Sequence, residues 1–193
     1  KPLSEVTIPE TSAEKAKGDI VIVADLKDAD SQLGRMIERF KAVMPMNTKL
    51  VNIAEYPFKG GCLGCFNCAS DGKCVYKDGF DEFLRNEIQT ADSIVYAFTI
   101  KDHSMGATFK MYDDRQFCNG HRTVTMGMPI GYLVSGEYSK EPNLQMILEG
   151  RSEVCGNFLA GIATDEVKKY ADYITDSVDE DGVFKALKHF NVI

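Results

Sequence analysis

The residues with the most distinctive chemistry are cysteines, and four of the six fall between positions 62 and 74. Cys62, Cys65, Cys68 and Cys74 have the spacing C-x2-C-x2-C-x5-C. Two-residue gaps let consecutive thiolates converge on one face of a cubane cluster, while the intervening amides can point at its sulfides. The segment also contains several glycines, which permit the tight curvature of a wrapping loop. The pattern therefore predicts a 4Fe-4S cluster bound by these four cysteines.

Other uses of these cysteines stay open. Structural zinc usually pairs two knuckles across a longer spacer, and the third cysteine here follows the second after two residues. Disulfides form in air, but a chain in a reducing compartment does not depend on them. Cys118 and Cys155 lie outside the motif and are interpreted as ordinary core thiols.

Composition and charge exclude several classes of partner. The formal net charge is −7 and the isoelectric point is near 5.0, which opposes a nucleic-acid partner because phosphate backbones are held by clustered Lys and Arg. No run approaches the roughly 18 apolar residues that span a bilayer, and no secretory signal is evident. We expect a cytoplasmic protein with no membrane and no nucleic-acid partner.

The length of 193 residues predicts one compact domain. Residues 1–18 are polar and contain prolines, which indicates an N-terminal arm or linker ahead of a domain over 19–193. The cysteine loop occupies 60–76. Because the chain begins at Lys1 rather than Met, we expect it to have been processed or cut from a longer product.

Short apolar runs alternate with segments of helical periodicity along the chain. The runs predict five strands, at 19–24, 49–53, 93–98, 130–134 and 158–163. Between and after them, apolar residues at helical spacing predict five helices, over 33–44 with Ser31 as N-cap, over 80–88, over 108–117, over 143–154 and around 167–174. This alternation predicts an α/β fold with a doubly wound parallel sheet and helices on both faces. In such sheets, ligands bind beyond the carboxyl ends of the strands.

The segments around the cysteines carry a family resemblance. Asp78-Gly79-Phe80 follows the cysteine loop, and Ala91-Asp92-Ser93-Ile94-Val95 lies further along. With these segments the chain resembles the iron–sulfur flavoproteins, within the wider NAD(P)H-dependent FMN reductase and flavodoxin-like group, over roughly residues 19 to 165. The resemblance implies a flavodoxin-like five-stranded sheet of order 2-1-3-4-5, bound FMN, and a homo-oligomer.

A second stretch, residues 97–110, carries the same resemblance. The family pattern is Gly-Ser-Pro-x-Tyr-x-Gly-Ser-x-x-Ala-x-x-Lys, followed by Asp-Arg, in a loop that contacts the flavin ring. Thr99 stands in place of the proline and Lys101 in place of the aromatic residue. The matching residues are Ser104, Ala107, Lys110, Asp114 and Arg115.

The phosphate loop departs further from the family, because Ser-Pro-Arg-x-x-x-Asn-Thr is replaced by Asp25-Leu26-Lys27-Asp28-Ala29-Asp30-Ser31. A helix N-terminus still binds anions through its free amides. Alternatively, Asp28 and Asp30 simply cap the helix. The resemblance implies that FMN is surrounded by Lys27, Ser31, Gln32, Thr99, Ile100, Lys101, Asp102, His103, Ser104, Ser135 and Gly136.

These features lead to an expected function. The resemblance implies an FMN-dependent oxidoreductase, akin to the NAD(P)H-dependent FMN reductases, that passes electrons between a redox partner protein or nicotinamide, FMN and the cluster. No general acid–base pair is evident, so no catalytic side chain is assigned. One alternative is a degenerate flavodoxin-like domain without flavin that acts as a redox relay or interaction module. Another is a flavin reductase without a cluster.

Overall fold

The computed structural model describes residues 18–120 and 124–166. The expected N-terminal arm therefore lies outside the described residues except for Gly18, and so does the helix expected around 167–174. Among the described helices, none is long and apolar enough to cross a membrane.

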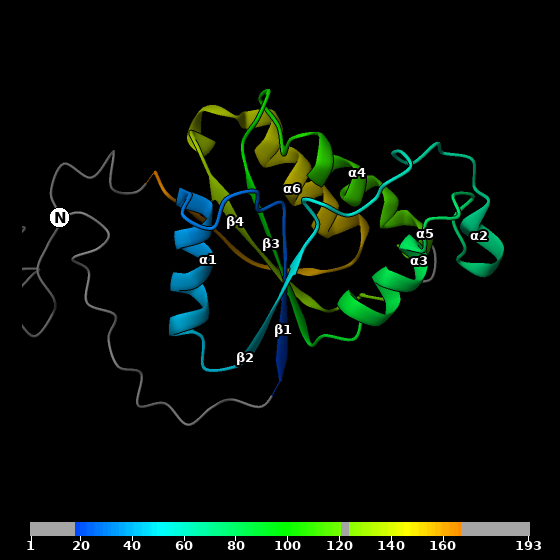
Figure 1. The fold of residues 1–193 in the computed structure, drawn as a ribbon, viewed down its shortest axis with the longest axis horizontal. Coiled ribbons are helices and arrows are strands. Elements are labelled where there is room, and N and C mark those ends of the chain that lie inside the picture. The colour runs from blue at the N-terminus through cyan, green and yellow to red at the C-terminus, as the bar shows by residue number, and fades with distance from the viewer. Residues whose placement is uncertain (1–17, 121–123, 167–193) are drawn as a thin grey trace, which may run out of the picture.

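Five parallel strands form one sheet in the order β2-β1-β3-β4-β5, which confirms the expected flavodoxin-like topology (Figure 1). Each strand predicted from an apolar run is present, with small shifts at its ends. β2 moves the most, since it begins two residues earlier than expected. The strands are β1 (Asp19–Ala24), β2 (Asn47–Asn52), β3 (Ser93–Thr99), β4 (Pro129–Ser135) and β5 (Phe158–Thr164).

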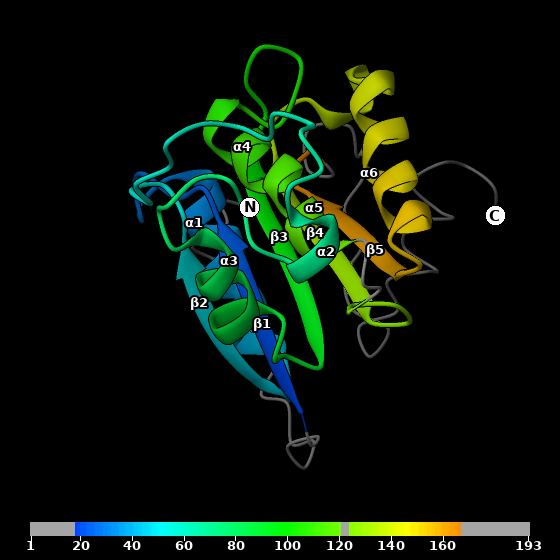
Figure 2. The same cartoon turned by 90° about the vertical axis from the view of Figure 1, so that its right-hand side faces the viewer.

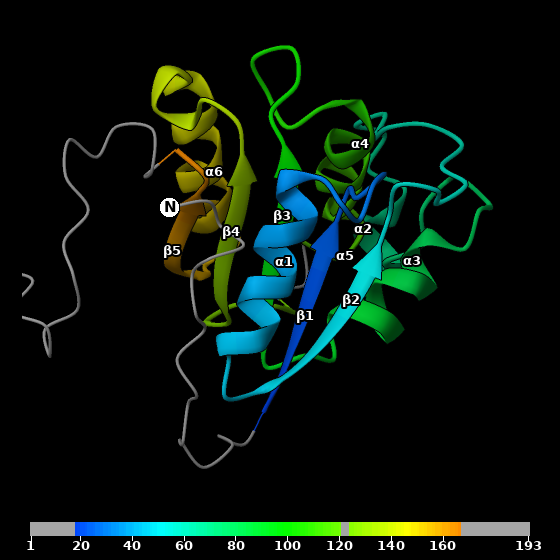
Figure 3. The same cartoon turned by 60° about the vertical axis from the view of Figure 1, so that its left-hand side comes forward.

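The first helix, α1 (Gln32–Val43), covers one face of the sheet (Figure 3). Ser31 is its N-cap, as predicted, because the Ser31 hydroxyl accepts a 3.1 Å hydrogen bond from the backbone N–H of Gly34. Leu33 and Ile37 are buried against the sheet. The helix ends just before Pro45, which cannot continue it.

The remaining helices cover the opposite face (Figure 2). The helix predicted over 108–117 is present as α4, which ends at Arg115, and a second short helix begins at Phe117 after a break at Gln116. The segment predicted over 80–88 begins as an α-helix and widens into a π-helix. The elements are α3 (Phe80–Phe83), η2 (Leu84–Ile88), α4 (Ala107–Arg115), α5 (Phe117–Gly120), η3 (Tyr138–Lys140) and α6 (Pro142–Val154).

The sheet separates two apolar cores because successive strand residues point to opposite faces. In β1, Val21 and Val23 pack in the core beneath α3, α4 and α6, whereas Ile20 and Ile22 pack beneath α1. A strand buried on both faces needs a continuous apolar run, which is why β1 could be recognised from its sequence. This rigid sheet positions the loops at its carboxyl edge.

Candidate functional site

The cysteine loop connects β2 to α3 and crosses the molecule to reach the far side of α4. Its short helix α2 (Cys68–Asp71) lies beside α5 (Figure 2). Gly64 has a φ of 63° and Gly72 a φ of 74°, which are conformations that glycine adopts at little cost. The turn at Gly64 brings its backbone N–H to 3.5 Å from the Cys62 sulfur. An amide facing a sulfur is the arrangement expected of a cluster-binding loop.

The four predicted ligands line one cavity together with Cys118. All are free thiols: Cys62 and Cys65 are exposed, while Cys68 and Cys74 are half-buried. Burial raises the pKa of the Cys68 thiol, and the neighbouring motif cysteines raise it further. Within residues 18–120 and 124–166, no three His, Cys, Asp or Glu side chains converge on a position for a single metal ion. The donor set fits an iron–sulfur cluster, because four thiols of one loop face one cavity.

Cys118 is closer to this site than its sequence position indicated. It is buried in α5, and burial together with the nearby Cys74 and Cys68 raises the pKa of its thiol to about 12. The interpretation of Cys118 as an ordinary core thiol is incomplete, since it also contributes to the wall of the cysteine cavity.

A buried ion pair anchors the loop. Arg115, at the end of α4, donates hydrogen bonds of 2.5 and 2.8 Å to the two carboxylate oxygens of Asp78. The Arg115 and Asp78 side chains are only 1% and 2% exposed. The guanidinium lowers the pKa of Asp78 to about 2, mainly through these hydrogen bonds. Asp78 lies just after the end of the cysteine loop, so the Arg115–Asp78 pair fixes that end of the loop to α4.

The expected FMN residues lie in three loops at the carboxyl edge of β1, β3 and β4. Thr99 is aligned with Ser135 across the sheet, and the Ile100 N–H donates a 2.8 Å hydrogen bond to the Ser135 carbonyl. Gly136 lies so close to Ile100 that a Cβ on Gly136 would be 3.1 Å from the Ile100 Cβ. The structure therefore brings Thr99, Ile100, Ser135 and Gly136 together.

The first of these loops, residues 25–31, leads to Gln32 at the first turn of α1. The backbone N–H of Asp30 donates to the Asp28 carboxylate at 2.9 Å, and the Ser31 hydroxyl donates to the Asp28 carbonyl at 2.6 Å. Lys27 is exposed. Asp25 is 8% exposed, and one of its carboxylate oxygens has no hydrogen-bond partner among the described residues. The helix N-terminus offers amides to a phosphate, while the carboxylates around it oppose one.

The second loop folds into a tight hairpin. The backbones of Lys101 and Ser104 exchange two hydrogen bonds of 2.9 Å, and the intervening Asp102 and His103 have φ values of 50° and 59°. Asp and His are among the residues that most readily adopt positive φ. His103 is 88% exposed, and its Nδ1 is 2.9 Å from a Glu141 oxygen. Its predicted role as a donor to a flavin carbonyl stays a prediction.

The third loop is hydrogen-bonded to two acidic residues that no feature of the sequence led us to expect here. Asp165, just after β5, accepts a 2.7 Å hydrogen bond from the Ser135 hydroxyl and a 2.9 Å hydrogen bond from the Gly136 N–H. The neighbouring Glu166 likewise accepts hydrogen bonds from the Ser139 N–H and hydroxyl at 2.7 and 2.9 Å. The Ser135 hydroxyl and the Gly136 N–H, both expected to contact the flavin, are therefore already hydrogen-bonded to the Asp165 carboxylate.

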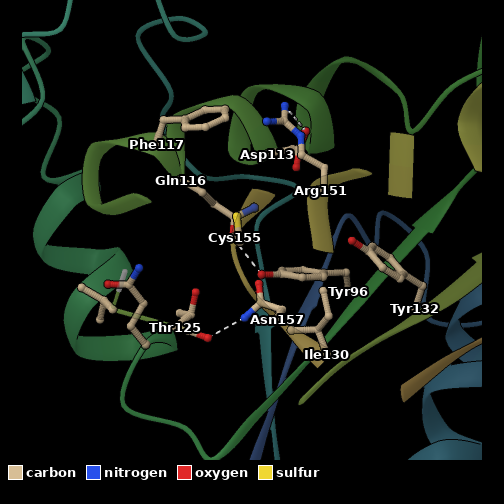
Figure 4. A pocket seen from close by; sticks show the side chains of 12 residues that line it. Tyr96, Asp113, Gln116, Phe117, Thr125, Ile130, Tyr132, Arg151, Cys155 and Asn157 are labelled. Carbon is tan, nitrogen blue, oxygen red and sulfur yellow. Dashed lines mark hydrogen bonds and ion pairs between the residues drawn. The ribbon is translucent and has the colours of Figure 1, made fainter. Parts of the chain in front are cut away.

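A separate pocket lies near the amino ends of β4 and β5 (Figure 4). Its polar groups are paired with one another: Tyr96 donates a 2.8 Å hydrogen bond to Gln116, and Arg151 is 2.7 Å from Asp113. Burial raises the pKa of the half-buried Cys155 thiol in its wall. The ion pair of this pocket connects α4 to α6, and Phe117 in its wall also lines a second cavity with Cys62 and Cys68.

Comparison with known proteins agrees with this architecture. No family model matches the chain. A curated iron–sulfur flavoprotein of Clostridioides difficile (strain 630) is 30% identical over 54 residues, which are 28% of this chain and 24% of that protein. The match thus spans about a quarter of the relative's length.

Solved structures match over most of the chain. An azoreductase from Bacillus anthracis (strain Sterne) has a TM-score of 0.58 and 14% identity, with 92% of this chain and 100% of that chain covered. An NAD(P)H:quinone oxidoreductase from Methanothermobacter marburgensis has a TM-score of 0.55 and 17% identity, with coverages of 90% and 94%. An FMN-dependent NADH-azoreductase from Bacillus anthracis (strain Ames Ancestor), in complex with FMN, has a TM-score of 0.51 and 11% identity, with coverages of 76% and 86%.

Together, the sheet order and these neighbours define a flavodoxin-like α/β domain. The fold expected from the resemblance is confirmed, and the curated match, over about a quarter of that relative's length, is named an iron–sulfur flavoprotein.

Proposed function

We propose that this protein is an FMN-dependent oxidoreductase of the iron–sulfur flavoprotein type. Cys62, Cys65, Cys68 and Cys74 bind a 4Fe-4S cluster, and FMN binds at the carboxyl edge of the sheet. The proposal depends mainly on one observation: the four motif cysteines are free thiols that line one cavity, next to a buried ion pair. The name of the curated match and the FMN complex among the structural neighbours support it.

The chain's own residues have distinct roles in this proposal. FMN exchanges electrons singly or in pairs and the cluster exchanges them singly, so the protein mainly positions the two groups. The N-terminus of α1, with Ser31 and Gln32, faces the phosphate. The hairpin of 101–104 and the turn at Ser135 and Gly136 border the ring. The electron donor is NAD(P)H or a redox partner protein, and the molecule works as a homo-oligomer in the cytoplasm.

The visible absorption spectrum of anaerobically purified protein tests this proposal, with iron and acid-labile sulfide assayed on the same sample. We expect the two resolved bands of oxidised flavin on a broad cluster absorption, with about four irons per chain. Flavin bands without iron would instead identify a flavin reductase that lacks a cluster. Zinc in place of iron would identify a structural metal site.

A second candidate function is a flavin-free redox relay or interaction module. It is favoured by the carboxyl edge itself, where Asp165 engages Ser135 and Gly136 and where Asp25, Asp28 and Asp30 surround the expected phosphate position. This candidate predicts a brown protein with iron and sulfide but no flavin bands, even after incubation with FMN. A colourless protein without iron would contradict both candidates.

A further inference from the structure

The cysteine loop is closed by one carboxylate. Asp78 accepts a 3.2 Å hydrogen bond from the backbone N–H of Lys59, which precedes the loop, and a 3.4 Å hydrogen bond from that of Phe80, which follows it. Tyr56 adds a 3.0 Å hydrogen bond to the Asp78 carbonyl. The two ends of the segment that holds all four motif cysteines therefore meet at Asp78.

Arg115 holds this carboxylate from the side of α4. Its guanidinium carbon lies 4.9 Å from the centroid of the Tyr76 ring and 4.5 Å from that of Phe80. Aromatic faces attract a cation, and their attraction is stronger where water is excluded. A planar guanidinium that binds a carboxylate through two donors and stacks on rings is not replaceable by lysine, which offers a point charge.

The same guanidinium lies beside the predicted cluster ligands. Arg115 lines the cysteine cavity together with Cys74 and the other motif cysteines. Asp78 engages the two terminal nitrogens of Arg115, and the buried Arg115 Nε has no hydrogen-bond partner among the described residues. A buried cation is therefore part of the wall of the cysteine cavity.

From this arrangement we propose that Arg115 is a positioning residue for the cluster, with two effects: it fixes the loop through Asp78, and it places a buried positive charge in the wall of the cluster cavity. The inference rests on the proposed function, because it requires the cluster. Nearby charge is one of the factors that set the reduction potential of a cluster. Reduction adds negative charge to the cluster, so a buried cation in the cavity wall favours the reduced state.

The test uses the full chain, reconstituted anaerobically with iron and sulfide under identical conditions. The main variant is the double substitution Arg115→Gln with Asp78→Asn, which removes both charges and leaves two amides that can hydrogen-bond. Lys41→Gln with Glu38→Gln is the control, because it also removes both charges of an ion pair, at an exposed position on α1 that does not line the cysteine cavity. The readouts are the melting temperature, the iron retained against a chelator, and the midpoint potential from a titration followed by electron paramagnetic resonance.

We expect the double variant to lose iron to the chelator about 10- to 100-fold more readily than the wild type. Losses of this size are typical when a residue that supports the metal ligands, without binding the metal itself, is removed. Arg115 lines the cavity and Asp78 does not, so the loss of the cation outweighs the loss of the anion. We therefore also expect the midpoint potential of the double variant to become more negative, while Lys41→Gln with Glu38→Gln matches the wild type. A merely structural role would lower stability and retention but leave the potential of the remaining cluster unchanged, and that result would overturn the proposal.

Two further outcomes are decisive. If the double variant does not fold, Arg115→Lys replaces it, because lysine keeps the charge but cannot bind Asp78 through two donors; wild-type retention in Arg115→Lys would overturn the proposal. If the variants match a wild-type protein that does carry a cluster, only this inference fails. A wild-type protein that binds no iron contradicts the proposed function, and the inference with it.

Discussion

The carboxylate of Asp165 binds the hydroxyl of Ser135 at 2.7 Å, and its second oxygen accepts the backbone N–H of Gly136 at 2.9 Å. The last residue of β4 and the turn after it are thus held by a residue that follows β5. A flavin ring at this edge would compete with Asp165 for the same donors. Whether this protein takes up flavin depends on that competition.

Asp165→Ala is expected to increase the affinity for FMN. It frees the Ser135 hydroxyl and the Gly136 N–H and removes a negative charge, so we expect about 2- to 10-fold tighter binding, the equivalent of about one hydrogen bond. Quenching of FMN fluorescence during titration with protein measures the affinity. Glu38→Ala, on the exposed side of α1, is the control. Equal or weaker binding by Asp165→Ala would mean that Ser135 and Gly136 do not contact the flavin.

The first loop packs against α1 at a glycine, and this contact is also testable. A Cβ on Gly34 would lie 2.0 Å from the Ala29 carbonyl oxygen, whereas a Cβ on Gly150 in α6 meets nothing within 4 Å. Gly34→Ala should therefore lower the free energy of unfolding by about 1–3 kcal/mol. Gly150→Ala, the matched control, should raise it by up to about 1 kcal/mol, because alanine is the better helix former. Urea unfolding measures both, and a neutral Gly34→Ala would show that the loop moves away freely.

The strands and helices could be predicted from the sequence because they depend on local patterns. β1 is a continuous apolar run buried on both faces, and Ser31 caps α1 through a residue three positions away. The break at Gln116, within the helix expected over 108–117, was not predicted because the apolar periodicity continues across it. Periodicity alone does not register such a break.

The candidate site was predicted less completely because its partners are distant in the sequence. Asp78 and Arg115 are 37 residues apart, and Ser135 and Asp165 are 30 apart. The resemblance included both Asp78 and Arg115 but did not pair them, and nothing local marks Asp165 as a hydrogen-bond acceptor. Cys118 was likewise assigned to the core, because only the packing of α2 beside α5 brings it to the motif cysteines.

The Asp78–Arg115 pair predicts a loss of stability in acid. The pKa of Asp78 is lowered from 3.8 to about 2, so the pair stabilises the fold above pH 4, and this contribution disappears as the pH falls towards 2. A shift of this size corresponds to ~2 kcal/mol. The difference in unfolding free energy between wild type and Asp78→Asn should therefore shrink by about that amount between pH 5 and pH 2. Asp102→Asn, at an exposed hairpin tip, serves as the control; parallel curves for wild type and Asp78→Asn would contradict the prediction.

Serine substitutions at each cysteine distinguish the cluster ligands from their neighbours. Replacing Cys62, Cys65, Cys68 or Cys74 removes a thiolate ligand, and we expect each variant to hold far less iron than the roughly four per chain of a cubane cluster. Cys155→Ser is the control, because Cys155 lines the separate pocket of Figure 4. Iron and sulfide per chain, measured after identical anaerobic reconstitution, give the comparison.

Cys118→Ser makes this series decisive, because Cys118 lines the same cavity as the four motif thiols. It lies on α5, outside the loop that holds the four cysteines of the C-x2-C-x2-C-x5-C motif. We therefore expect Cys118→Ser to bind iron as the wild type does. If Cys118→Ser loses its iron while Cys62→Ser keeps it, the ligand set is wrong, and the cluster lies deeper, between α2 and α5. If the wild type and all six variants bind equally little iron, the thiols hold no cluster.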